Sequence, residues 1–192
     1  MLNRDNAFAL LKEYTDSESL VRHGLAVEAA MRWYAEHFGE SAAEITAWGI
    51  AGLLHDIDWE KFPDNHPYEG NKILKEAGYP EEILTAIMGH ANFTGVARET
   101  KMAKTLFAVD ELSGLVTASV LVRPDKSIFN LEAKSVLKKM KDKAFARGCN
   151  RDDITQGAAE LGISLEIHTQ NVITALRKIA PELGLKGVGQ AA

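Results

Sequence analysis

The sequence contains a single cysteine, Cys149, among 192 residues. One thiol excludes an internal disulfide and a zinc site built from several thiolates. No apolar run approaches the roughly 18 residues that span a bilayer, and residues 1–6 lack the charged and apolar regions of a signal peptide. We therefore expect a cytoplasmic protein that does not bind a membrane.

The sequence also lacks a net positive charge. Its 22 basic and 27 acidic residues give a formal charge of −5 at pH 7, which argues against a stable complex with nucleic acid. The charge is uneven, because residues 98–151 carry 12 basic and 6 acidic groups. This basic segment has two interpretations: a helix face in contact with solvent, or a wall beside an anionic ligand.

The two-residue alternation of half-buried strands is missing as well, and helical periodicity dominates. The length suits one core, so we predict a single all-α domain, a helical bundle over residues 1–192. Thr15-Asp16-Ser17-Glu18 and Ser41-Ala42-Ala43-Glu44 both have the spacing of a capping box, and Gly39 lies between them as a stop. The predicted helices cover residues 15–38, 41–56, 80–95, 98–119, 130–146, 151–161 and 164–179.

Three other segments depart from plain helical periodicity. Residues 116–122 are rich in β-branched side chains, which also allows a short strand there. Pro63 and Pro67 interrupt the chain around His66. Residues 184–192 are rich in glycine and small side chains, and we expect this tail to be frayed.

The stretch AGLLHDID, residues 51–58, places His55 and Asp56 at the end of an apolar run. Burying an ionised carboxylate without a partner costs free energy. The two residues therefore form either a buried hydrogen-bonded pair or part of a metal site. Gly49 and Gly52, on the same predicted helix, leave room for another element to approach closely.

Three histidines have a simple structural interpretation. His23 lies on the apolar stripe of the first predicted helix, where a hydrogen-bonded core histidine is more usual than a metal ligand. His37 lies near the C-terminus of that helix, where the helix dipole favours an imidazolium. His168 lies on the last predicted helix without an acidic neighbour. We predict structural or surface roles for His37 and His168.

Three further residues lie in unusual surroundings. His66 lies in a loop before a helix, His90 lies close to a helix end, and Asp110 interrupts an apolar row. With the residues above they form an ordered set H…HD…H…H…D, consisting of His23, His55, Asp56, His66, His90 and Asp110. This set resembles the ligand set of the HD-domain superfamily of metal-dependent phosphohydrolases, and the chain looks like an HDIG-like hydrolase.

The resemblance covers about residues 17–126. VRHGLAVEAAM resembles the first helix of the family, and GLLHDID resembles its signature helix. NHPYEGNKIL, AIMGHAN and KTLFAVDELSGLVTA resemble the segments that carry the later ligands. The resemblance implies an HD-like metal-binding core over residues 17–126, followed by C-terminal helices over residues 127–183.

The resemblance also implies a binuclear metal centre in which Asp56 bridges two ions. One ion would be held by His23, His55, Asp56 and Asp110, and the second by Asp56, His66 and His90. Imidazole and carboxylate ligands suit divalent iron, manganese, zinc, cobalt or nickel. Two such ions lower the pKa of a shared water and clamp the attacking and leaving oxygens of a phosphoryl transfer.

We therefore predict hydrolysis of a small anionic phosphate ester, such as a nucleotide, through metal-bound hydroxide by a phosphomonoesterase or phosphodiesterase. The segment VLVRPDKS resembles the Arg-Pro segment that follows the last aspartate in the HD-GYP branch. The cations expected to neutralise the phosphate are Lys61, Lys104, Arg123 and Lys126. The alternatives are a di-iron oxygenase on the same scaffold, which uses the same six ligands, and a regulatory module that binds a metal or ligand without turnover.

The sequence departs from the HD-GYP branch directly after the signature. It has His55-Asp56-Ile57-Asp58-Trp59 where that branch has HDIGK, and its Gly-Tyr-Pro word at residues 78–80 precedes His90. We therefore do not expect cyclic-di-GMP as the substrate. Asp58 either accepts a hydrogen bond from a ligand histidine or terminates the helix.

Overall fold

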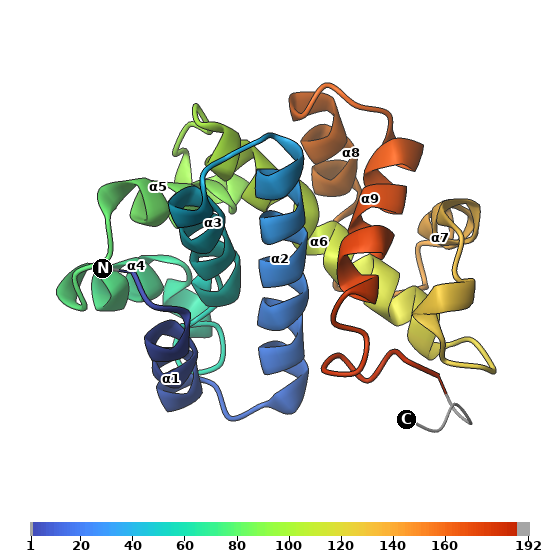
Figure 1. Cartoon of the computed structure of the whole chain (residues 1–192), viewed down its shortest axis with the longest axis horizontal. Coiled ribbons are helices and arrows are strands. Elements are labelled where there is room, and N and C mark those ends of the chain that lie inside the picture. The colour runs from blue at the N-terminus through green and yellow to red at the C-terminus, as the bar shows by residue number, and fades with distance from the viewer. Residues whose placement is uncertain (1, 188–192) are drawn as a thin grey trace. The chain divides into compact units, whose positions relative to one another are not determined.

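The computed structural model describes residues 2–187, and the regular elements in this range are helices (Figure 1). The chain divides into two compact units, Met1–Phe107 and Ala108–Ala192. The first contains α1 (Arg4–Tyr14), α2 (Glu18–His37), α3 (Ala42–Leu54), α4 (Tyr68–Glu76), α5 (Glu81–Gly89) and the start of α6 (Lys101–Leu121). The second contains the rest of α6, α7 (Ala133–Met140), α8 (Arg151–Glu160) and α9 (Leu165–Arg177).

The predicted all-α fold class is confirmed, whereas a single domain over residues 1–192 stays a prediction. Within residues 2–187, no helix combines the length and the apolar character needed to cross a membrane. Residues 116–121 continue α6, so the alternative of a short strand there is wrong.

The first unit is built around α2 and α3, which lie side by side (Figure 1). Glycines allow their close approach. A Cβ atom on Gly24 of α2 or on Gly52 of α3 would lie 2.9 Å from a backbone carbonyl oxygen of the other helix. Gly49 faces a side chain instead, because its Cβ would lie 2.8 Å from Arg32 Cγ. The expectation that these glycines leave room for another element is confirmed.

The N-terminus of α2 differs from the prediction. Thr15 does not cap α2, because it is the C-cap residue of α1, a helix without a counterpart among the predicted ones. Ser17 is the N-cap residue, and the amides of Asp16 and Ser17 both donate to Glu60 Oε2 at 3.0 Å. A carboxylate from a distant turn therefore accepts hydrogen bonds from the amides just before α2, and the predicted capping box at Thr15 is wrong.

The predicted start of α3 is confirmed. The Ser41 hydroxyl accepts a hydrogen bond from the Glu44 amide at 3.2 Å. Gly39, with φ 75°, follows α2 in the left-handed conformation that commonly ends helices. Helix α3 ends at Leu54, so His55 is its C-cap residue.

Two predicted helices end earlier than expected. The helix predicted over residues 80–95 ends at Gly89, and the helix predicted over residues 130–146 ends at Met140. After Met140 the chain turns around Arg151, whose guanidinium donates to the carbonyl oxygens of Phe145, Ala146 and Cys149. These carbonyl groups are thus satisfied by a side chain rather than by further helix.

The buried histidine of the second unit has a structural role, as predicted. His168 on α9 has no exposed surface, and its Nε2 donates to the Ala108 carbonyl oxygen at 2.8 Å. Burial lowers the pKa of His168 to about 4, because it penalises the charged imidazolium. The imidazole is therefore neutral at physiological pH.

The tail predicted to fray from Gly184 contacts Ser127 and Ile128 over its described part. The Ile128 amide donates to the Leu185 carbonyl oxygen at 2.9 Å, and Leu185 is buried. Ser127 and Lys186 form an isolated antiparallel β-bridge. Fraying of residues 184–187 stays a prediction, and residues 188–192 lie outside the described residues.

Candidate metal centre

Five of the six predicted ligands lie in the first unit, one within a helix and four at or next to helix ends. His23 is on α2, His55 is the C-cap residue of α3, and Asp56 follows it. His66 lies just before α4, as predicted, and His90 is the C-cap residue of α5. A helix end leaves the side chain of its cap residue free to turn toward a neighbouring element.

Asp56 lies at the centre of the four imidazoles. The Nε2 atoms of His23 and His55 lie 3.7 and 3.4 Å from Asp56 Oδ2. The Nε2 atoms of His66 and His90 both lie 3.6 Å from Asp56 Oδ1. Each carboxylate oxygen therefore faces its own pair of ring nitrogens, which is the arrangement that a carboxylate bridging two cations requires.

The centre is buried on one side and accessible on the other. The His55 side chain is fully buried, and the side chains of His66 and His90 are 5% exposed. The side chains of Asp56 and His23 are 25% and 23% exposed. Asp56 and His23 are therefore the residues of the cluster in the first unit that are most accessible to solvent.

Hydrogen bonds behind three of the rings fix their orientation and tautomer. His55 Nδ1 donates to the Gly52 carbonyl oxygen at 2.8 Å, and His90 Nδ1 donates to the Ile87 carbonyl oxygen. His66 Nδ1 donates to Asp58 Oδ1 at 2.7 Å. Because these oxygens can only accept, each neutral ring carries its proton on Nδ1 and directs the lone pair of Nε2 toward Asp56.

A close pair of ring nitrogens offers a place for a cation. His66 Nε2 and His90 Nε2 lie 3.1 Å apart, although both are acceptors in the neutral rings. With Asp56, these residues offer three ligand atoms within 4.8 Å of one another. Converging lone pairs and a carboxylate repel unless a positive charge lies among them, and neutral imidazole and carboxylate ligands fit a divalent transition metal.

Asp58 supports the centre from behind. This carboxylate has no exposed surface, and its second oxygen accepts a hydrogen bond from the Gly70 amide at 2.6 Å. A Cβ atom on Gly70 would lie 2.9 Å from Asp58 Cγ, so the close approach requires glycine. The prediction that Asp58 accepts a hydrogen bond from a ligand histidine is confirmed.

Arg98 is a supporting residue that the sequence analysis missed. Its guanidinium donates to the Gly89 carbonyl oxygen at 2.9 Å and to Asn92 Oδ1 at 3.0 Å. The same group lies 3.7 Å from the centre of the Phe107 ring. Arg98 thereby stabilises the turn that contains His90. No local sequence pattern predicts these contacts.

The other predicted site residues of the first unit lie in varied surroundings. Lys61 Nζ donates to the Glu13 carbonyl oxygen at 2.5 Å and lies 5.2 Å from the centre of the Tyr14 ring. Its ammonium group thus ties the turn after Asp56 to the end of α1. Lys104 is half-buried on α6. Their roles in binding phosphate stay predictions.

The remaining predicted site residues belong to the second unit. Asp110 is half-buried on α6, and its role as a ligand stays a prediction. Arg123 donates from Nε and Nη2 to the two carboxylate oxygens of Asp125, at 2.9 Å each. This contact holds the pKa of Asp125 well below its usual range. The guanidinium fork expected to bind phosphate is therefore engaged by a carboxylate, and Lys126 beside it is exposed with φ 47°.

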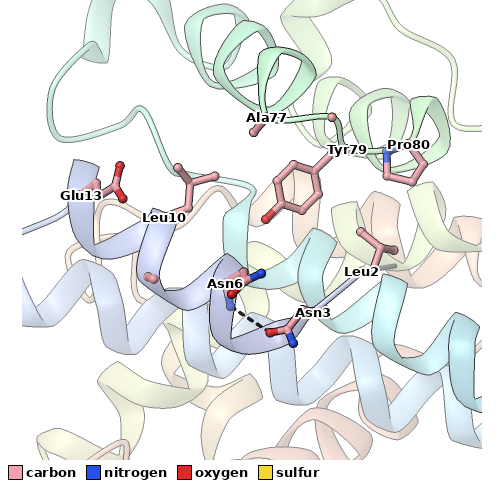
Figure 2. Close-up of a pocket in the computed structure, with 10 residues that line it drawn as sticks. Leu2, Asn3, Asn6, Leu10, Glu13, Ala77, Tyr79 and Pro80 are labelled. Atoms are coloured by element: carbon pink, nitrogen blue, oxygen red, sulfur yellow. Dashed lines mark hydrogen bonds between the residues drawn. The ribbon is translucent and has the colours of Figure 1, made fainter.

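A pocket of about 660 Å³ in the first unit lies apart from these residues (Figure 2). It lies between α1 and residues 77–80, and Tyr79 projects from the loop toward α1 (Figure 2). None of the predicted ligands is among the residues that line it. The volume of this pocket therefore gives no information on the chemistry of the histidine cluster.

Comparison with known proteins agrees with the geometry of the cluster. The model of the HD domain family matches residues 20–115, which is half of the chain and includes all six residues of the ordered set. Searches of curated proteins and of solved structures gave no match. With its helical fold, its histidines gathered around Asp56 and this match, the chain belongs to the HD-domain family.

Proposed function

We propose that the chain is a metal-dependent phosphohydrolase that cleaves a small phosphate ester at a binuclear centre. The observation that carries the proposal is the pairwise approach of four Nε2 atoms to the two oxygens of Asp56. The HD-domain family, to which the chain belongs, consists mostly of metal-dependent phosphohydrolases.

The donor atoms divide into two sets that share Asp56. The first ion would be held by His23, His55 and Asp56, with Asp110 as the predicted fourth ligand, and the second by Asp56, His66 and His90. When bound, divalent ions supply the Lewis acidity that activates water near neutral pH and offsets the negative charge of a phosphate.

The contribution of the chain itself is orientation. The carbonyl oxygens of Gly52 and Ile87 and the carboxylate of Asp58 hold three rings in the tautomer that presents a lone pair. The rings therefore need not rotate before they bind a cation. The accessible edge of Asp56 leaves room for the phosphate ester, while the buried histidines stay fixed. A site organised in advance in this way has little reorganisation to undergo during the reaction.

The test is reconstitution with single metals. Metal-free protein is loaded separately with Mn²⁺ and Fe²⁺ and assayed without oxygen for phosphate release from nucleoside monophosphates, sugar phosphates and p-nitrophenyl phosphate. We expect release with Mn²⁺, because the chemistry needs a Lewis acid but no electron transfer. Asp56→Ala should lose both metal and activity while its circular dichroism stays helical. His37→Ala, at an exposed histidine of α2, is the matched control and should keep both.

Three outcomes would contradict the proposal. Full metal occupancy in Asp56→Ala, measured by elemental analysis, would rule out the bridging role. Oxygen consumption with iron alone, and no phosphate release across the panel, would assign the chain to the di-iron oxygenases. Tight metal binding without either reaction would identify a regulatory module.

A further inference from the structure

Exposed aromatic side chains of the first unit gather in sequence around the candidate ligands. The exposed large hydrophobic residues among residues 2–107 are Trp59, Tyr68 and Phe93, which are 46%, 52% and 70% exposed. They follow Asp56, His66 and His90, respectively, by two or three residues. A single exposed apolar side chain needs no explanation, so the contacts of each residue decide whether it belongs to the centre.

Trp59 is the aromatic residue whose contact with the centre is direct. Its amide donates to the Asp56 carbonyl oxygen at 3.0 Å. Its indole lies against the His66 imidazole, with ring centroids 4.9 Å apart and planes at 88°. Because Asp58 fixes the His66 ring, the indole is also held in a defined orientation beside the centre.

The contact with His66 explains the orientation of the indole but leaves much of it accessible. An edge-to-face contact uses one part of the ring, and the residue remains 46% exposed. Leaving that much apolar surface in water forgoes part of the free energy that burial provides. A ligand that covers the ring would recover it. Indole is also rigid, so it loses little conformational entropy when a second ring stacks on it.

We propose that Trp59 stacks on a planar aromatic group of the substrate, next to the phosphate. This inference rests on the proposed phosphohydrolase function and names its substrate class: phosphate esters that carry an aromatic ring, as aryl phosphates and nucleotides do. Stacking recognises the face of a ring rather than its substituents, so Trp59 selects esters that carry an aromatic ring over alkyl and sugar esters that lack one.

The kinetic test uses phenyl phosphate and glycerol 3-phosphate, which differ in the presence of a ring. With Mn²⁺ bound, Trp59→Ala should raise KM for phenyl phosphate about 10-fold, as expected for the loss of one stacked ring. The value of kcat should stay nearly constant, because stacking away from the phosphorus stabilises the bound substrate and the transition state alike. Both constants for glycerol 3-phosphate should stay unchanged. Trp59→Phe, which keeps a flat ring, should restore most of the affinity.

A matched control is Trp33, whose ring stacks on His37 in α2 with centroids 5.0 Å apart. Trp33→Ala should leave KM for both esters unchanged. Equal losses for both esters in Trp59→Ala would mean that the indole only supports His66, and would overturn the proposal. Unchanged constants for both esters would overturn it as well.

A binding measurement separates this proposal from the proposed function. Phenylphosphonate and methylphosphonate cannot be hydrolysed as esters, and their dissociation constants follow from calorimetry on metal-loaded and metal-free protein. Tighter binding of phenylphosphonate, lost in Trp59→Ala, would support the aromatic site even if no ester were hydrolysed. Equal affinities of the wild-type protein for the two phosphonates would overturn it.

Discussion

Three histidines around Asp56 owe their orientation to hydrogen-bond acceptors behind their rings, namely the carbonyl oxygens of Gly52 and Ile87 and the carboxylate of Asp58. Asp58 differs from the two carbonyl groups because it is a carboxylate with no exposed surface. Its two oxygens accept hydrogen bonds from His66 Nδ1 and from the Gly70 amide. These two donors compensate a group that would otherwise be costly to bury.

Replacing Asp58 with alanine should weaken metal binding. His66 would lose the acceptor that keeps its proton on Nδ1, and losses of about 10- to 100-fold in metal affinity are typical of such changes. Competition against a chromophoric chelator measures the affinity. Asp64→Ala, at an exposed carboxylate in the same loop, is the control and should bind as the wild type does. A wild-type affinity in Asp58→Ala would show that Asp58 does not determine the tautomer of His66.

The sequence predicted a residue of the centre where a sequence pattern contained it. It did not predict a residue that contributes only through a tertiary contact. The cluster around Asp56 could be expected because the order of the histidines resembles a family's ligand set. Gly70 and Arg98 could not, since each reaches the centre through a tertiary contact with no local signal. The charge of Lys61 was visible in the sequence, but its partner, the Glu13 carbonyl oxygen, lies 48 residues away.

At the level of the helices, a local sequence pattern predicted a helix start correctly where the hydrogen-bonding groups are close in the sequence. The capping box at Ser41 forms as expected, because the hydroxyl and the Glu44 amide are three residues apart. The box predicted at Thr15 does not form, because Thr15 ends α1 and Glu60, from another turn, accepts hydrogen bonds from the Asp16 and Ser17 amides. Tertiary contacts of this kind override a weak local preference.

The close packing of α2 and α3 gives a prediction on stability. Gly24→Ala would place a methyl group 2.9 Å from the Leu53 carbonyl oxygen, so the helices would have to separate. We expect the free energy of unfolding to fall by about 1–3 kcal/mol, a typical cost of overpacking. The measurement is urea unfolding followed by circular dichroism.

Gly148→Ala serves as the control, because a Cβ atom there meets no atom within 4 Å. This variant should be as stable as the wild type or slightly more so. Since α2 carries His23 and α3 leads into His55, Gly24→Ala should also weaken metal binding. Unchanged stability and unchanged metal affinity in Gly24→Ala would show that the helix pair adjusts without cost.

At the scale of the whole molecule, the dependence of stability on pH has a contribution outside the metal centre. His168 lies in the second unit with its pKa lowered to about 4 by burial, against an ordinary value of about 6.5. The unfolded chain therefore binds a proton at His168 between these values, whereas the folded chain does not. This contribution to stability is complete above the unfolded pKa and is lost as the pH falls toward the folded pKa.

His168→Gln should remove this dependence, because a glutamine amide can still donate to the Ala108 carbonyl oxygen but does not titrate. Between pH 7 and pH 5, the wild-type protein should lose about 2 kcal/mol more stability than His168→Gln. Urea unfolding at each pH, with both proteins metal-free, measures the difference and cancels the contribution of the histidines around Asp56. His37→Gln, at an exposed histidine, should follow the wild type. Parallel curves for His168→Gln and the wild type would mean that His168 takes up its proton equally well in the folded and unfolded states, so that burial does not lower its pKa.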